Sequence, residues 1–381
     1  MNFEFTEDHK MIQESAKEFA REVIAPSSID RDIKAEFPTE IIKQMGELGF
    51  MGMMVTPEYG GAGLDTISYV LAMIEISKVD ASCGVIMSVN NSLVCYGLEK
   101  YGSDFIKQKY LIPLAKGEKL GAFALSEPEA GSDATKQKTT ADRNGDFYIL
   151  NGIKNWITNG TTADYVLVMA TTDKEKAHHG ISTLLVERGT PGFDHGKKED
   201  KLGIRSSDTC SLTFENCKIP KENLVWEEGK GFNFAMNTLN GGRIGIASQA
   251  IGIAEGAFEA ALKYSKERKA FGTIISNHQA IQFKLADMAV KIDAAKMLTL
   301  KAAAMKDAGL KYYKEAAMAK LYASTIAFEC ASEAIQIHGG YGYVREYLVE
   351  RYLRDSKITE IYEGTNEIQR VVIARALLDS K

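Results

Sequence analysis

Residues 277–307 read NHQAIQFKLADMAVKIDAAKMLTLKAAAMKD, a run without proline or glycine in which apolar side chains recur at helical spacing. One apolar stripe is expected at Phe283, Ala286, Ala289, Ile292 and Ala295. Asp287 and Lys291 lie outside this stripe at i,i+4, as on a solvated helix face. The run therefore predicts one long amphipathic helix.

Three similar patterns surround this helix, at 231–268, 313–338 and 344–378. No proline follows Pro220, so none of the three need be interrupted. Turns are expected at Asp307-Ala-Gly309 and at His338-Gly339-Gly340. Long helices with short connections favour an antiparallel four-helix bundle, and we assign it to residues 231–381.

Upstream of residue 231 the sequence pattern is first helical and then β-rich. Residues 120–230 hold short β-rich runs such as 165–170 and 181–186, separated by Asn-Gly and Pro-Gly turns. They predict an antiparallel β-barrel or sandwich rather than βαβ units. Residues 1–119 look helical: Thr6 and Pro38-Thr39 open helices, and 67–98 reads as two buried helices. The predicted fold class is a multidomain α+β protein in the order α, β, α.

Composition excludes several kinds of protein. The 381 residues include 46 Lys and Arg against 51 Asp and Glu, giving a net charge of -5. Such a chain, without a basic tail, is a poor candidate for nucleic acid or an anionic membrane. No apolar run approaches the ~20 residues of a membrane span. The acidic N-terminus is neither a signal nor a transit peptide, so we expect a cytoplasmic protein, or a mitochondrial matrix protein if the chain is a processed form.

Familiar catalytic motifs are missing. There is no GxGxxG, GxxxxGK[ST], HExxH or GxSxG, which disfavours nicotinamide, P-loop, metalloprotease and hydrolase sites. The five scattered cysteines show no zinc spacing, so no metal site is expected.

Polar groups bounded by small residues do occur in a few segments: LSEPEAGSD at 125–133, NWITNG at 155–160, RKAFG at 268–272, and QIHGGYG at 336–342 with IYEGTNE at 361–367. Taken singly, each is typical of a turn, a core aromatic residue or a solvated helix end. Glu363 alone would be a surface carboxylate. In an apolar, ligand-filled cleft its pKa would be raised and it could act as a base.

Taken together and in this order, these segments resemble the acyl-CoA dehydrogenase family of flavoproteins. The resemblance covers essentially the whole chain. MGELGF, YGGAGLD, GVIMSVNNSL and LNGGRIGIASQAIGIA resemble its short-chain (butyryl-CoA) branch most. It implies FAD, a homotetramer, and α,β-dehydrogenation of an acyl-CoA to the trans-2-enoyl-CoA. Electrons would pass to an electron-transferring flavoprotein, and Glu363 would be the base that takes the α-proton.

The resemblance also implies site residues. The flavin ring would be held by Phe123, Leu125, Ser126, Trp156 and Thr158. The pyrophosphate and adenosine would be reached from the neighbouring subunit by Arg268, Phe271 and Gln279. Gln336, Gly339 and Gly340 would pack on the adenosine half, and Thr365 and Glu367 would complete the cofactor site. The acyl-CoA would be touched by Ser132, Leu239, Asn240, Arg243, Tyr362 and Gly364.

Some residues depart from the family pattern. Asn240 stands where Asp is frequent, which puts its contact with the CoA arm in question. His338 occupies a position that is usually aromatic or aliphatic, and Trp226 one that is usually small. Branches with another base place it near Asn240–Arg243, where Gly241 and Gly242 here argue for Glu363 instead.

Three other interpretations compete with a dehydrogenase. An acyl-CoA oxidase, reoxidised by oxygen, belongs to a branch with much longer chains. A flavin-containing binding protein of the DNA-associated branch is disfavoured by the acidic net charge. A purely structural all-α protein would leave the β-rich middle unexplained.

Overall fold

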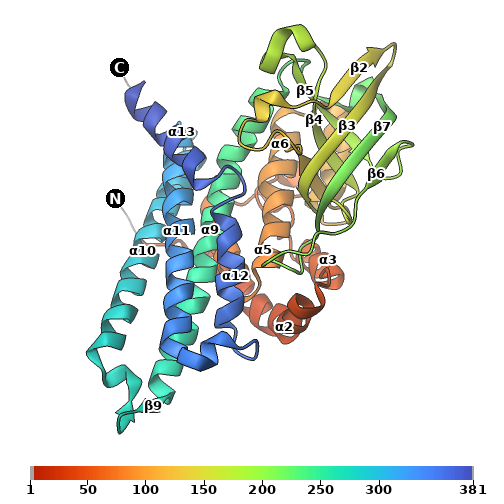
Figure 1. The fold of residues 1–381 in the computed structure, drawn as a ribbon. Coiled ribbons are helices and arrows are strands. Elements are labelled where there is room, and N and C mark those ends of the chain that lie inside the picture. The colour runs from red at the N-terminus through yellow and green to blue at the C-terminus, as the bar shows by residue number, and fades with distance from the viewer. Residues whose placement is uncertain (1–3, 380–381) are drawn as a thin grey trace.

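The computed structural model describes residues 4–379, in which helices come first, a β-sheet follows, and long helices complete the chain (Figure 1). The bundle helices α9–α12 lie side by side, with the sheet at one end of the molecule and the β9 hairpin at the other. Helices α5 and α6 lie between the bundle and the sheet. One apolar core runs through all three parts, because buried residues of α4, β4 and α9 belong to the same cluster.

The N-terminal helices are α1 (Glu7–Phe19), α2 (Ala25–Lys34), α3 (Thr39–Glu47), α4 (Thr66–Val79), α5 (Ala81–Ser88), α6 (Tyr96–Tyr101), α7 (Asp104–Ile106) and α8 (Ile112–Ala115). The predicted cap is confirmed, since the Thr6 side chain accepts a hydrogen bond from the His9 backbone. Asp80 separates the two buried helices and caps α5 by accepting from the Ser82 N–H at 2.8 Å. The expectation that no apolar run approaches the length of a membrane span is wrong: within residues 4–379, Ala81–Tyr101 is long and apolar enough to cross a membrane. However, 94% of its apolar window is buried, as in a core helix.

The middle strands are β1 (Gly121–Ala124), β2 (Thr140–Asn144), β3 (Phe147–Thr158), β4 (Tyr165–Thr171), β5 (Ile181–Glu187), β6 (Phe193–His195), β7 (Thr209–Pro220) and β8 (Leu224–Val225). They form a sheet of order β6-β7-β3-β2-β4-β5-β8. The predicted strand-rich middle is confirmed, and most pairs are antiparallel. However, β1 pairs with β4 in parallel, which makes the sheet mixed. β3 bulges between Lys154 and Ile157, where it pairs with β7.

The C-terminal helices are α9 (Gly231–Glu267), α10 (Gln279–Asp307), α11 (Tyr313–His338), α12 (Val349–Thr359) and α13 (Asn366–Leu378), and the hairpin of β9 (Lys269–Ala270) and β10 (Thr273–Ile274) connects α9 to α10. The predicted bundle is confirmed. The fourth pattern, expected as one element over 344–378, is wrong in detail: it divides into α12 and α13. The interruption contains Glu363 and Gly364, both with left-handed backbone.

The predicted apolar stripe of α10 is right for Ile292 and Ala295 but wrong for Phe283, Ala286 and Ala289, which are exposed. Phe283 is 63% exposed, whereas Met288, Ile292, Ala295 and Thr299 are buried. Lys291 pairs with Glu329 of α11 at 2.7 Å, so the face expected to be solvated borders a neighbouring helix. The small and apolar residues of α10 are compatible with burial of either of two helix faces. Contacts with α9 and α11 decide which face is buried.

Candidate functional site

Glu363 lies at the interruption between α12 and α13. Its φ is 53° and that of Gly364 is 87°. A left-handed glutamate costs roughly 1–2 kcal/mol, so the surrounding structure must hold it in place. The residue is half-buried, but its Oε2 is inaccessible and has no hydrogen-bond partner among residues 4–379. A buried carboxylate oxygen without a partner is the kind of group that acts on a ligand.

Space for this carboxylate comes from Gly242 on α9. A Cβ placed on Gly242 would lie 1.9 Å from Glu363 Oε2 and 2.8 Å from Leu93 Cδ2. Any larger residue would therefore displace the carboxylate. The neighbouring Gly241 has more room, since its Cβ would lie 3.7 Å from the Ser92 carbonyl oxygen.

Two cations surround Glu363. Burial raises the pKa of Glu363 to about 8, and the charges of Arg243 and Lys320 oppose that rise. Burial lowers the pKa of Arg243, although Glu363 favours its charged form. Arg243 Nη1 donates to Asn240 Oδ1 at 2.8 Å, so Asn240 contacts the arginine in this structure. A carboxylate that titrates near neutral pH is suited to general-base catalysis.

The turn around Glu363 is held by residues that the sequence did not single out. Gln249 of α9 accepts from the Tyr362 hydroxyl and donates to the Ala81 carbonyl oxygen at 2.7 Å. Gln369 donates to the Gly364 carbonyl oxygen at 2.8 Å. Lys320 of α11 is fully buried and donates to the same carbonyl at 2.9 Å. One signal was available for Lys320: it is a lysine among alanines at buried helical spacing, in AAMAKLYAS.

Five of the predicted cofactor residues lie in the β-domain. Trp156 is 62% exposed with φ 62°, because the bulge of β3 turns it out of the sheet. The backbone N–H of Asn155 donates to the Ser126 carbonyl oxygen at 2.8 Å, so the Leu125–Ser126 segment lies beside the Trp156 strand. Phe123 stacks at 6.4 Å on Phe234 of α9. Thr158 follows on β3 and pairs with Thr209.

A buried ion pair joins these two segments. Lys154 of β3 has no exposed surface, and its Nζ donates to Glu127 Oε1 at 2.8 Å and to the Leu125 carbonyl oxygen at 3.0 Å. Glu127 also accepts from the backbone N–H of Thr139 at 3.0 Å. The pair therefore fixes the 125–139 loop against the strand that carries Trp156.

Lys154→Met is expected to lower the midpoint of thermal unfolding strongly, since it leaves Glu127 buried and unpaired, at a cost of roughly 3–5 kcal/mol. Differential scanning fluorimetry with excess FAD would measure this. Adding Glu127→Gln removes the buried charge and keeps one acceptor oxygen for the backbone N–H groups of Lys138 and Thr139, so it should recover part of the loss. Lys138→Met is the matched control, because Lys138 and its partner Glu129 are both 73% exposed. Equal midpoints for Lys154→Met and Lys138→Met would contradict the prediction.

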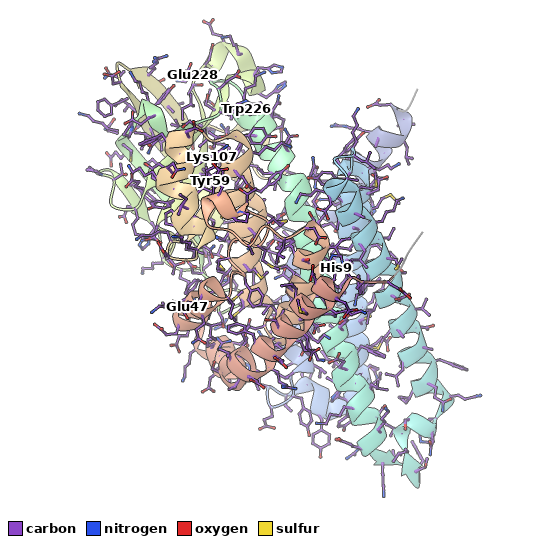
Figure 2. All side chains as sticks on the ribbon, turned by 180° about the vertical axis from the view of Figure 1, so that it is seen from behind. His9, Glu47, Tyr59, Lys107, Trp226 and Glu228 are labelled. Carbon is purple, nitrogen blue, oxygen red and sulfur yellow. The ribbon has the colours of Figure 1, made fainter. Side chains whose placement is uncertain are left out.

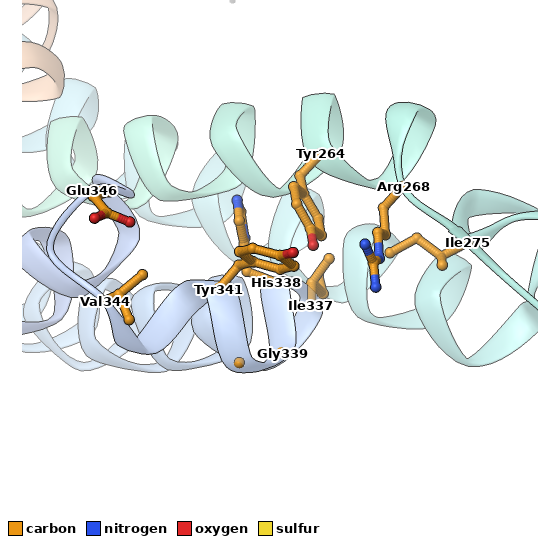
Figure 3. Close-up of a pocket in the computed structure, with 10 residues that line it drawn as sticks. Tyr264, Arg268, Ile275, Ile337, His338, Gly339, Tyr341, Val344 and Glu346 are labelled. Carbon is orange, nitrogen blue, oxygen red and sulfur yellow. The ribbon is translucent and has the colours of Figure 1, made fainter.

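Six further cofactor candidates, Arg268, Phe271, Gln279, Gln336, Gly339 and Gly340, lie at the far end of the bundle. A pocket of about 560 Å³ there is lined by Arg268, Gly339 and Gly340 together with Tyr264, His338 and Tyr341 (Figure 3). The Arg268 guanidinium lies 5.4 Å from the centre of the Tyr341 ring. A Cβ on Gly339 or Gly340 would meet no atom of the described residues within 4 Å, which leaves this backbone open to a ligand. Phe271 is 95% exposed, Gln279 is exposed at the start of α10, and Gln336 is exposed near the end of α11.

Within one chain, the cofactor candidates of the β-domain and those around Arg268 do not lie together. Gly242 and Arg268 are both on the helix α9 or at its end, and the helical rise separates them by ~39 Å. Thr365 and Glu367 are at the Glu363 end, where Thr365 caps α13 by accepting from the Ile368 N–H at 3.3 Å. Among the predicted substrate residues, Tyr362 and Gly364 flank Glu363, and Leu239, Asn240 and Arg243 lie on the facing stretch of α9. Ser132 is exposed and lies on the 125–139 loop.

His338 and Trp226, which depart from the family pattern, are both packed within the fold. His338 is buried and stacks on Tyr264 at 4.2 Å, which places it in the wall of the pocket in Figure 3. Burial lowers the pKa of His338, which favours the neutral ring. Trp226 stacks on Tyr101 at 4.4 Å. Figure 2 shows Trp226 near the start of α9.

Known proteins resemble the chain over its full length. Family models match three ranges: acyl-CoA dehydrogenase N-terminal domain over 6–118, middle domain over 122–217 and C-terminal domain over 229–378. A mouse protein named short-chain specific acyl-CoA dehydrogenase, mitochondrial, is 52% identical over 99% of this chain and 92% of its own length.

Two solved structures also resemble this chain over nearly its whole length. The butyryl-CoA dehydrogenase of Megasphaera elsdenii superimposes with a TM-score of 0.98 at 47% identity, covering 99% of this chain and 100% of its own. A chain from a study of the electron transferring flavoprotein of Acidaminococcus fermentans and flavin-based electron bifurcation gives 0.99 at 53% identity, covering 100% of both chains. The expected resemblance is confirmed: the chain belongs to the acyl-CoA dehydrogenase family.

Proposed function

We propose that this chain is an FAD-dependent short-chain acyl-CoA dehydrogenase that converts a butyryl-CoA-like thioester into the trans-2-enoyl-CoA. The observation that carries the proposal is the inaccessible, unpartnered Oε2 of Glu363, held at a helix interruption opposite Gly242. The chain is similar over its full length to the short-chain enzyme of mouse and to the Megasphaera butyryl-CoA dehydrogenase. This similarity supports the proposed reaction and the short acyl group of the proposed substrate.

In this proposal Glu363 removes the α-proton of the bound thioester. Tyr362 and Gly364 hold the substrate on one side, and Leu239, Asn240 and Arg243 hold it from α9, with Ser132 reaching from the β-domain. The nearby Arg243 and Lys320 charges favour the ionised Glu363 and the negative charge that develops as the proton leaves. FAD, when bound, supplies the acceptor of the β-hydride at its N5.

The residues present suit FAD. The exposed Trp156, with Phe123, Leu125, Ser126 and Thr158, offers an aromatic surface and hydrogen-bonding groups for a flavin ring. At the far end, Arg268 offers a bidentate donor for a pyrophosphate, and the open backbone of Gly339 and Gly340 admits an adenosine. Phe271, Gln279, Gln336, Thr365 and Glu367 are assigned to the same cofactor.

We further propose that one FAD is held between two copies of the chain. The Glu363 end and the Arg268 end of α9 are ~39 Å apart, so the cofactor residues at the two ends are assigned to different FAD molecules. The exposed Phe271 and Phe283 are apolar surface that a second copy would cover. A homotetramer built as a dimer of dimers would place each FAD between two copies and would cover Phe271 and Phe283.

The partner that receives the electrons is proposed to be an electron-transferring flavoprotein, supported by the Acidaminococcus structure. The proposed location is the cytoplasm, or the mitochondrial matrix for a processed chain, since relatives occur in bacteria and in mitochondria. The proposed domains are 1–119, 120–230 and 231–381, of which residues 1–3 and 380–381 lie outside the described structure.

A visible spectrum of the purified protein, titrated without oxygen with acyl-CoAs of increasing length, tests this function. We expect a flavin absorbance that butyryl-CoA bleaches most completely. A protein that binds no FAD, or a flavin that no acyl-CoA bleaches, would overturn it. Measuring hydrogen peroxide after oxygen is admitted separates a dehydrogenase, which releases little, from an oxidase.

A further inference from the structure

Lys320 is a buried cation next to the site. It lies in α11 with no exposed surface, on a face with the buried Ala316, Ala319 and Ala323. Its Nζ donates to the Gly364 carbonyl oxygen at 2.9 Å and to Asn366 Oδ1 at 3.0 Å. Both acceptors are neutral, so neither cancels the charge. A buried ammonium without a carboxylate partner is costly to a fold and is usually retained for a function.

Both acceptors belong to the segment that presents Glu363. Asn366 Oδ1 also accepts from the Ser324 hydroxyl at 2.9 Å, and the Gly364 carbonyl oxygen also accepts from Gln369. α11 therefore fixes the chain directly after Glu363, at Gly364 and Asn366. A free turn of this kind would return to a more stable backbone conformation.

The charged and titratable groups that face Glu363 come from each helix packed against it: Arg243 on α9, Lys320 on α11, and Tyr69 on α4, with Tyr362 beside it on the chain. Burial lowers the pKa of Lys320 to about 7, while Glu363, Glu360 and Glu367 favour its charged form and Arg243 disfavours it. The charged Lys320 and the ionised Glu363 favour each other, so the two groups titrate as a coupled pair.

We propose that Lys320 is a positioning residue for the base: it fixes the Glu363–Gly364 turn and its positive charge favours the ionised carboxylate. The proposal rests on the proposed role of Glu363. Lys320 does not touch the substrate in this proposal. It helps to set the pH range in which the Glu363 carboxylate is ionised.

The pH dependence of kcat/KM tests the proposal, because it reports the pKa of the base in the free enzyme. The active form is the deprotonated carboxylate, so kcat/KM of the native enzyme should rise with pH through about 8. Lys320→Met removes a cation and should move this midpoint upward by roughly one unit or more. Below the midpoint, kcat/KM should then be about tenfold lower. Ser324→Ala is the matched control: it loses a hydrogen bond to Asn366 but keeps the charge, so its midpoint should not move.

A second measurement follows proton removal without flavin reduction. An acyl-CoA with sulfur in place of the β-carbon has an acidic α-proton but no β-hydride to give. In D₂O the holoenzyme should exchange the α-proton of this thioester for deuterium, which mass spectrometry detects. The midpoint of exchange against pD should shift in Lys320→Met as the midpoint of kcat/KM does.

The outcomes separate the possibilities. An unchanged midpoint in Lys320→Met or in Lys320→Gln, with FAD bound, would overturn the proposal. Loss of FAD or of folding in both variants would assign Lys320 to folding alone and would also overturn it. Absence of bleaching and of exchange in the native enzyme would instead overturn the proposed function.

Discussion

Glu363→Gln is expected to leave FAD bound and to abolish bleaching of the flavin by butyryl-CoA. Glutamine has nearly the shape of glutamate, so it fits beside Gly242, but its amide does not accept the α-proton. General-base catalysis contributes roughly 10²–10⁴-fold, and the rate of flavin reduction should fall by at least that factor. Stopped-flow absorbance at the flavin maximum measures this rate.

The matched control is Glu360→Gln, three residues earlier on the same segment. Glu360 pairs with Lys357 at the end of α12 and contributes only a distant charge to Lys320. Its variant should reduce the flavin at close to the native rate. Full bleaching of the Glu363→Gln enzyme would exclude Glu363 as the base, whatever the Glu360→Gln enzyme does.

Gly242→Ala is expected to reduce the rate of flavin reduction by about 10²-fold or more while FAD stays bound. The added methyl group would lie 1.9 Å from Glu363 Oε2, so the carboxylate has to move away from its position. A displacement of about 1 Å from the productive geometry can cost 10²-fold in rate. Single-turnover kinetics at saturating butyryl-CoA would measure the loss in the chemical step.

The neighbouring Gly241→Ala controls for the change in helix propensity. Its methyl group would meet the Ser92 carbonyl oxygen at 3.7 Å, an ordinary contact, and alanine is the better helix former. This variant should keep most of the native rate. Similar losses in both variants would show that the glycines matter for something other than space beside Glu363.

The order of elements was accessible from the sequence because its signals are local. Asp80 interrupts an apolar run, and Pro38 opens a helix. The division between α12 and α13 was missed although Gly364 and Thr365 are ordinary signals for it, since the apolar pattern on both sides resembles one helix.

Other features depend on contacts between distant segments. The phase of α10 is decided by its neighbours, and Phe283 is on the side away from them. The proposed site residues were reached by resemblance, whereas Gln249 became visible only when the fold placed it beside the Glu363 turn. Lys320 stands out in the sequence as a lysine among alanines, but its contact with the Gly364 carbonyl oxygen does not. Spacing along a helix predicts which side a residue faces, but it does not predict which distant segment covers that side.

The length of α9 has a thermodynamic consequence. If the two ends of one helix serve two different FAD molecules, then cofactor affinity and subunit association are linked functions. Each FAD that binds stabilises the assembled state by mass action, and each dissociation of subunits discards half of every binding site. Saturation with FAD would then vary with protein concentration as well as with FAD concentration, and dilution alone would turn a holoenzyme into free flavin and separate chains.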